Sequence, residues 1–170
     1  MAQNGTIVPR MRKIPQFGLR PARRDEFAFA EAIYINAMRP LMLLLDAWDE
    51  PRRRAAIRRS FKAADSHIIT LDATDIGWMQ VTERDADYNL AQIQIVEEYC
   101  GLGIGTRIIL DLQRKAAQEG KTVSLSVVRT NRAIGLYRRL GFRMIDPDAT
   151  PIIDMVWTPP DAAAAPLGAS

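Results

Sequence analysis

The sequence contains one cysteine, Cys100, and one histidine, His67, among its 170 residues. A single cysteine excludes a disulfide within the chain, which fits the reducing cytoplasm where we expect the protein to act. One cysteine and one histidine also cannot supply the usual ligands of a zinc cage, so we predict no metal centre. His67 stands in a β-rich run away from the motifs described below, as is typical of a structural histidine.

Long apolar stretches are missing as well. The sequence has no run of about 18 apolar residues and no apolar segment near its start, so we predict neither a membrane span nor a membrane partner. The chain is 48% hydrophobic and 25% charged, which is typical of a soluble globular protein that forms one domain. Its net charge of +3 is mild and suits a polyanionic ligand.

Composition also suggests where the domain begins and ends. Residues 1–13 are polar and lack periodicity, and we interpret them as a flexible leader. Residues 159–170 are rich in proline and alanine, and we interpret them as a disordered tail. The predicted domain therefore spans residues 14–158.

The most informative stretch is Glu97–Gly105, which reads EEYCGLGIG. It lies between a β-like run, Leu90–Val96, and a helical run, Thr106–Glu119. Alternate glycines let the backbone turn sharply and direct successive N–H groups into one space at the positive end of a helix. That arrangement binds phosphate or pyrophosphate, although many such turns are plain connections. The glycines are Gly101, Gly103 and Gly105.

The residues after these glycines exclude two common phosphate motifs. A P-loop ends in Gly-Lys-Ser or Gly-Lys-Thr, whereas Gly105 is followed by Thr106 and Arg107. A dinucleotide fingerprint needs a third glycine at Thr106 or Ile108, and neither position has one.

A later segment, Asn131–Phe142, reads NRAIGLYRRLGF. Together with YCGLGIGT it resembles the GNAT superfamily of acyl-CoA-dependent N-acetyltransferases. The resemblance is specific over Ala91–Phe142, and one position departs from it, because Cys100 stands where the family has Gln or Arg. The later signature, N-x-A-x-x-L-Y-x-x-L-G-F, is matched at Asn131, Ala133, Leu136, Tyr137, Leu140, Gly141 and Phe142.

Periodicity and turn residues predict an α/β (α+β) fold, in which a mixed, mostly antiparallel sheet is flanked by helices and contains a central β-α-β unit. This is also the layout that the resemblance implies. Asp25 is expected to cap the first helix and Pro40 to end it. Predicted strands are Phe17–Pro21, Ser66–Asp72, Ile76–Glu83, Leu90–Val96, Val123–Val128, Phe142–Ile145 and Ile152–Trp157. Predicted helices are Glu26–Ala37, Leu41–Trp48, Pro51–Ala64, Ile104–Ala117 and Arg132–Leu140.

The resemblance implies acetyl-CoA as cofactor. Its pyrophosphate would bind the amides of Gly101, Leu102, Gly103, Ile104, Gly105 and Thr106. Its pantetheine arm would lie along the strand end at Ile95 and Val96, where a backbone N–H would polarise the thioester. Asn131 would contact the cofactor and cap the following helix. Tyr137 would act as general acid, since a phenol keeps its proton near neutral pH. The helical periodicity alone would instead favour a tyrosine that packs in the core.

The general base and the acceptor site are less well marked. The central strand carries amides where relatives often carry a glutamate, and we choose Glu83 as the candidate base. The alternatives are that Glu83 is only a solvated charge at the end of its strand, or that a chain of water molecules removes the proton without a dedicated base. Trp48 lies among acidic residues in the sequence and is the candidate for binding a cationic amine. The alternative is that Trp48 packs in the core.

We therefore predict an N-acetyltransferase that moves the acetyl group of acetyl-CoA directly to a primary amine, either a small molecule or a peptide. The alternative is a GNAT-fold protein that binds acyl-CoA without transferring it. A homodimer is left open. The basic run in Pro51–Ala64 raises a nucleic-acid hypothesis, but we interpret it as a solvated helix face and predict no nucleic-acid partner.

Overall fold

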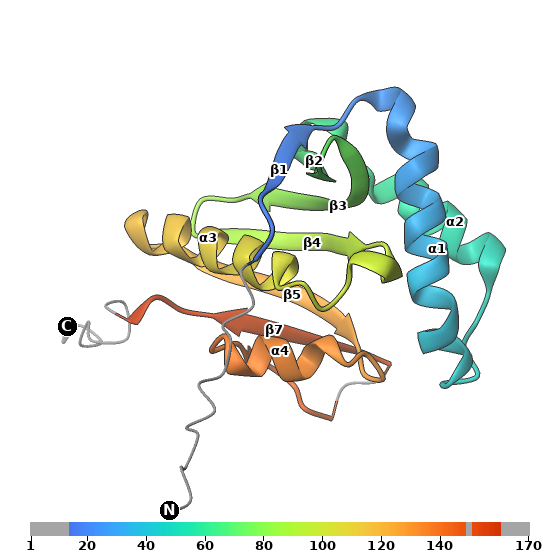
Figure 1. Ribbon diagram of the computed structural model, residues 1–170. Helices are drawn as coiled ribbons and strands as arrows, with labels where there is room; N and C mark the ends of the chain where they lie inside the picture. Colours follow the sequence, from blue (N-terminus) through green and yellow to red (C-terminus); the bar gives the residue numbers. More distant parts are fainter. Residues whose placement is uncertain (1–13, 149–150, 161–170) are drawn as a thin grey trace, which may run out of the picture.

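The computed structural model describes residues 14–148 and 151–160 (Figure 1). The predicted leader and residues 161–170 of the predicted tail lie outside the described residues. A seven-stranded sheet forms the centre of the fold, in the spatial order β1-β2-β3-β4-β5-β7-β6. The strands are β1 (Phe17–Pro21), β2 (Ser66–Leu71), β3 (Thr74–Glu83), β4 (Asp87–Ile95), β5 (Thr122–Val128), β6 (Arg143–Met144) and β7 (Ile152–Trp157).

All neighbouring strands pair antiparallel except β4 and β5, which are parallel. A parallel pair needs a crossover, and α3 supplies it, completing the predicted β-α-β unit. The predicted fold class is confirmed. The α-helices are α1 (Phe27–Leu43), α2 (Glu50–Ser60), α3 (Ile104–Gln118) and α4 (Ala133–Arg139), and the short 3₁₀ turns are η1 (Arg24–Glu26), η2 (Ala63–Asp65) and η3 (Glu97–Tyr99).

The helices cover both faces of the sheet (Figure 1). On one face, α1 and α2 pack on Ile68 and Trp78. On the other face, α3 and α4 pack on a larger cluster that includes Ile69 and Met79. Neighbouring residues of β2 and β3 thus enter opposite clusters, as the alternation of side chains along a strand requires. Two separate cores result, one on each side of the sheet.

Pro40 does not end α1, and the sequence-based expectation is wrong here. The helix continues to Leu43, because a proline removes only the hydrogen bond of its own nitrogen and one further turn can follow it. Leu44 N–H donates to the Pro40 carbonyl at 3.4 Å. The predicted helix Leu41–Trp48 is wrong as well, since this segment ends α1 and then turns at Asp46, whose φ is 51°.

The ends of two helices also differ from the prediction. Asp25 lies inside η1 and does not cap the first helix; the Glu26 carboxylate instead accepts a hydrogen bond from the Arg23 backbone N–H at 2.8 Å. Helix α2 begins at Glu50 because the Asp49 carboxylate accepts from the Arg52 backbone N–H at 2.9 Å, which satisfies a free donor of the first turn.

A β-bulge at Ala91 changes which face of β4 each side chain occupies. Gln80 pairs with Gln92, but the next residue, Val81, pairs with Leu90, so Ala91 is extra. The extra residue brings Leu90 into the cluster on the α3 side, opposite Gln92. A strand without a bulge would place Leu90 and Gln92 on one face, because side chains two residues apart lie on the same side.

Candidate active site

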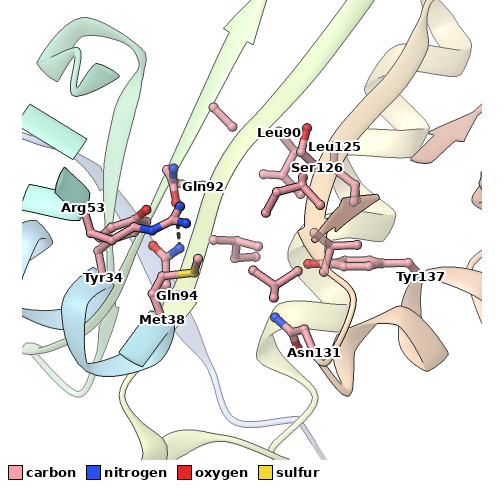
Figure 2. Close-up of a pocket in the computed structure, with 15 residues that line it drawn as sticks. Tyr34, Met38, Arg53, Leu90, Gln92, Gln94, Leu125, Ser126, Asn131 and Tyr137 are labelled. Carbon is pink, nitrogen blue, oxygen red and sulfur yellow. Dashed lines mark hydrogen bonds between the residues drawn. The ribbon is translucent and has the colours of Figure 1, made fainter. Parts of the chain in front are cut away.

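The two parallel strands at the centre of the sheet separate along their length. They pair only from Asp87↔Thr122 to Leu90↔Leu125, although β4 continues to Ile95 and β5 to Val128. A cavity of about 190 Å³ lies where they diverge (Figure 2). Its lining comes from α1, α2, β4, β5, the turn between β5 and α4, α4 itself and the start of β7: Tyr34, Met38, Arg53, Leu90, Ala91, Gln92, Ile93, Gln94, Leu125, Ser126, Val127, Val128, Asn131, Tyr137 and Ile152.

Two further cavities extend from this one, which we call the central cavity, toward the glycine-rich turn. The middle cavity, of about 570 Å³, shares Gln94, Asn131 and Tyr137 with the central cavity. The loop cavity, of about 330 Å³, shares Ile95 with the middle one and is lined by the glycine-rich turn. A trough therefore runs from that turn to the space between the separated strands.

The glycine-rich turn has the backbone conformation that its glycines allow. Gly101 and Gly103 have φ of 78° and 84°, in the left-handed region, and Gly103 is the N-cap residue of α3. A Cβ added at Gly101 would meet no atom within 4 Å, so the turn is open on that side. The exposed Arg139 of α4 lines the same cavity. Free amides of a helix start beside a guanidinium make this cavity a fit for an anion.

Cys100 holds the turn against the end of β4. Its thiol donates to the carbonyls of Ile95 and Val96, at 3.5 and 3.6 Å. Partial burial and the nearby Glu97 carboxylate raise the pKa of the thiol. A raised pKa disfavours the thiolate, so the site gives no support to a nucleophilic cysteine.

Two backbone positions at the end of β4 point in opposite directions. Val96 N–H donates to the Ile76 carbonyl at 2.8 Å and thus faces β3. Because alternate residues of a strand direct their backbone groups to opposite sides, the N–H of Ile95 faces the open edge beside the trough. Ile95 lines two of the cavities, whereas Val96 lines none of the three.

Asn131 joins the end of β5 to α4. The N-cap residue of α4 is Arg132 and not Asn131 as expected, but Asn131 Oδ1 still accepts from the backbone N–H of Ala133, the first residue of the helix, at 2.8 Å. Asn131 also lines the central and middle cavities. The adjacent Thr130 hydroxyl donates to the Leu41 carbonyl at 2.9 Å. This contact ties the β5–α4 turn to the last turn of α1 across the trough.

Tyr137 is buried at the wall of the central cavity. Its ring packs edge-on against Phe142 at 5.8 Å, and its hydroxyl points into the cavity (Figure 2). Burial raises the pKa of the phenol to about 12, because a charged phenolate is poorly solvated there. The phenol therefore carries its proton at neutral pH and presents it to the cavity.

Glu83 and Trp48 are not brought to the trough. Glu83 forms ion pairs with Lys121 at 2.6 Å and Lys115 at 3.9 Å, and the contact with Lys121 lowers the pKa of its carboxyl. Trp48 packs against the core between α1, α2 and the sheet. Neither lines the three cavities, so the geometry lends no support to the catalytic role expected of Glu83 or the acceptor role expected of Trp48.

Sequence reasoning missed several polar residues of the central cavity. Gln94 donates from Nε2 to Gln92 Oε1 at 2.8 Å, and Arg53 of α2 faces this pair (Figure 2). Ser126 lines the cavity, and its hydroxyl donates to Asp154 at 2.6 Å. For Arg53 a signal was present: it stands four residues before Ile57, so both share the buried face of α2.

The part of the chain that forms this site matches a known protein family. Residues 63–144 match the family model described as "Acetyltransferase (GNAT) domain", a range that includes β4, the glycine-rich turn, α3, β5 and α4. Among curated proteins no match to the sequence was found.

Solved structures show the same fold at low sequence identity. PaiA N-acetyltransferase from Thermoplasma acidophilum, in complex with coenzyme A, aligns with a TM-score of 0.66 and 15% identity, over 84% of this chain and 99% of that one. The ribosomal-protein-S18-alanine N-acetyltransferase from Escherichia coli aligns with a TM-score of 0.61 and 17% identity, over 84% and 94%. An acetyltransferase from Thermus thermophilus aligns with a TM-score of 0.63 and 14% identity, over 85% of this chain and 98% of that one.

In residues 14–148 and 151–160, no helix is both long enough and apolar enough to cross a membrane. Over those same ranges, His, Cys, Asp and Glu side chains form no cluster of three that could hold a metal ion.

Proposed function

Because the chain is a member of the GNAT superfamily, we propose that it transfers the acetyl group of acetyl-CoA to the primary amine of an acceptor. The observation that carries this proposal is the separation of β4 and β5 beyond Leu90 and Leu125, with the Tyr137 hydroxyl directed into the space between them. Two of the solved structures named above are called N-acetyltransferases, and one of these two was solved with coenzyme A.

The residues present fit acetyl-CoA. The turn from Gly101 to Thr106 offers free amides at the start of α3, and Arg139 offers a cation beside them. The open edge of β4 can pair with an extended amide-containing arm, as an added strand would. When bound, acetyl-CoA supplies the acetyl group as a thioester.

The N–H of Ile95 at the open edge of β4 is the proposed donor to the thioester carbonyl oxygen, which gains negative charge as the amine attacks. Removing one such donor typically costs about 2.7–4 kcal/mol of barrier. Val96 is not proposed for this role, because its N–H is already bonded to Ile76.

Tyr137 is the proposed general acid. Its hydroxyl would give its proton to the sulfur that leaves acetyl-CoA as the new C–N bond forms and the C–S bond breaks, and solvent would then restore that proton to Tyr137. Burial keeps the pKa of this phenol at about 12, so the proton is available over the range in which amines react.

Ser126 and Asp154 are the proposed route for the proton that the amine loses. The Ser126 oxygen lines the central cavity and can accept from the amine, while its hydroxyl donates to Asp154 at 2.6 Å. A proton can therefore pass through the serine to a carboxylate on β7. This route replaces Glu83, which is held in ion pairs with Lys115 and Lys121.

Amine-dependent release of free coenzyme A from acetyl-CoA tests the proposal, with mass spectrometry of the amine to detect the added acetyl group. A panel of amino acids, peptides, alkyl diamines and aminoglycosides covers the acceptor classes left open by the sequence. Release that depends on an amine, accompanied by an acetylated product, supports transfer. Binding of acetyl-CoA without release for any amine would favour the alternative, a binding protein without transferase activity.

That alternative has one observation in its favour. The central strand carries Gln92 and Gln94 at the cavity, and an amide cannot act as a base. The cytoplasmic location and the homodimer left open by the sequence stay predictions.

A further inference from the structure

Arg53 is placed differently from the other arginines of α2. Arg54 forms ion pairs with Glu50 and Glu31, at 2.9 and 3.1 Å, and Arg58 lies 3.8 Å from Glu31. Arg53 instead lines the central cavity, and its Nε is buried with no hydrogen-bond partner among the described residues. Helix α2 thus directs one guanidinium toward the proposed reaction site.

A second buried polar atom in this cavity also lacks a partner. Gln94 uses its Nε2 to bond Gln92, but its Oε1 is buried and accepts no hydrogen bond from the described residues. Leaving a buried donor or acceptor unpaired is costly, and most such groups in proteins are paired. The cavity therefore presents one cationic donor and one acceptor for which a ligand can supply the counterparts.

The charge of the lining narrows the kind of ligand. Among the described residues that line the central cavity, Arg53 is the one with a charged side chain, and none carries a carboxylate. Ser126 lies on the side of the cavity opposite Arg53 (Figure 2), and its hydroxyl donates to Asp154 on the neighbouring strand β7. A ligand with an anion toward Arg53 and an amine toward Ser126 matches both walls.

We propose that the acceptor is an amino acid whose free carboxylate pairs with Arg53, while its amine lies near Ser126 and Gln94; this rests on the proposed function. A guanidinium binds a carboxylate through two parallel hydrogen bonds, and such charge-assisted pairs are strong and directional. An alkyl diamine would bring a second cation toward Arg53 without a carboxylate in the lining to receive it, so diamines are poor acceptors.

The experiment compares the standard amino acids with their α-carboxamides, an alkyl diamine and an aminoalkyl phosphonate, with kcat/KM measured by release of coenzyme A. The best amino acid should exceed its own carboxamide by about tenfold or more, since only the acid can pair with Arg53. Carboxamides, the diamine or the phosphonate reacting as well as the acids would overturn the proposal.

Variants then assign the preference to Arg53. Arg53→Gln should remove the preference for acid over carboxamide, and Arg53→Lys should retain part of it, because the charge stays while the two-pronged contact is lost. Arg52→Gln is the matched control, since Arg52 is the exposed neighbour on the same helix, and it should keep the full preference. An unchanged preference in Arg53→Gln would contradict the assignment.

Failure of this inference differs from failure of the proposed function. If only the inference fails, amines are still acetylated but without regard to a carboxylate. If the proposed function fails, no amine raises the release of coenzyme A above the rate with buffer alone. Affinity for acetyl-CoA, measured by calorimetry, should be the same in wild type and Arg53→Gln, which also shows that the variant is folded.

Discussion

Leu90 of β4 pairs with Leu125 of β5, and this is the last pair before the two parallel strands separate. Both side chains are buried in the core on the α3 side, so the junction is fixed by packing. Beyond it, Gln92 and Gln94 on one strand and Ser126 on the other face a shared cavity. The site therefore follows from the point at which the sheet stops being continuous.

The first prediction concerns the glycine-rich turn. Acetyl-CoA at about 100 times its Kd should stabilise the protein by about 2.7 kcal/mol. Gly101→Ala should raise the Kd for acetyl-CoA by about tenfold or more, because a methyl group there occupies space through which an anion approaches the amides. Thermal shift and calorimetry with acetyl-CoA measure both effects.

A matched variant separates this effect from backbone strain. Gly120 follows the C-cap residue of α3 and has φ of 65°, and a Cβ there also meets no atom within 4 Å. Gly120→Ala carries the same kind of strain as Gly101→Ala, about 1–2 kcal/mol, but lies outside the loop cavity. It should lower the melting temperature and leave the Kd unchanged. Equal effects of both variants on the Kd would mean that the turn does not bind the cofactor.

The second prediction concerns Tyr137. Tyr137→Phe should lower kcat by about tenfold to a few hundredfold at saturating acceptor, since it removes only the proposed proton donor. The Kd for acetyl-CoA should stay nearly constant, and the ring should keep its contact with Phe142. A wild-type kcat in this variant, with chemistry shown to be rate-limiting, would return Tyr137 to a structural role.

The pH dependence gives an independent readout for the same residue. Burial raises the pKa of Tyr137 to about 12, so the phenol keeps its proton further into alkali than an ordinary tyrosine, which titrates near 10. We therefore expect kcat to show no fall between about pH 8 and about pH 10 from loss of this proton. A descending limb there in wild type that Tyr137→Phe abolishes would contradict the raised pKa.

A third prediction addresses the proton route through Ser126. Ser126→Ala and Asp154→Asn should each lower kcat by about tenfold, less than the usual general-base effect of about 10²–10⁴-fold, because water can partly replace the relay. The double variant should be no slower than the worse single variant, since both residues serve one route. Glu98→Gln is the control: Glu98 is an exposed carboxylate that lines none of the three cavities, and its loss should leave kcat unchanged.

The fourth prediction is that Glu83 contributes to stability and not to catalysis. Glu83→Gln should leave kcat within about twofold of wild type, a change too small for a general base. Lys121 lowers the pKa of this carboxyl, so the stabilisation is present above the pKa of the unfolded chain and is lost as the pH falls through the folded value. Urea midpoints of wild type and variant should thus differ near neutral pH and converge in acid. A large loss of kcat would restore Glu83 as the base.

Much of the fold could be predicted from local patterns. The strand Phe17–Pro21 has the predicted bounds, and the helix after the glycine-rich turn extends one residue beyond its predicted end. Both segments have clear start and stop signals. The bulge at Ala91 could not be predicted, because it depends on how β4 pairs with β3 and not on its own sequence.

The site, like the fold, has parts that the sequence predicts and parts that depend on tertiary packing. The proposed cofactor-binding segment could be predicted from sequence, since its glycines and Asn131 act through local backbone geometry. Arg53 was placed on a solvated face with its neighbours, because only the packing of α2 on the sheet decides which arginine faces the cavity. Glu83 was chosen as the general base because it lies close in sequence to the central strand. The structure places it in an ion pair with Lys121.

Hydrogen exchange with and without acetyl-CoA tests most directly whether the separation of β4 and β5 forms the cofactor site. The account predicts slower exchange for the amides of residues 101–106 and for Ile95 at the open edge of β4, with little change in the distant η2 segment, Ala63–Asp65. Slower exchange confined to another part of the chain, or no change at saturating acetyl-CoA, would contradict it.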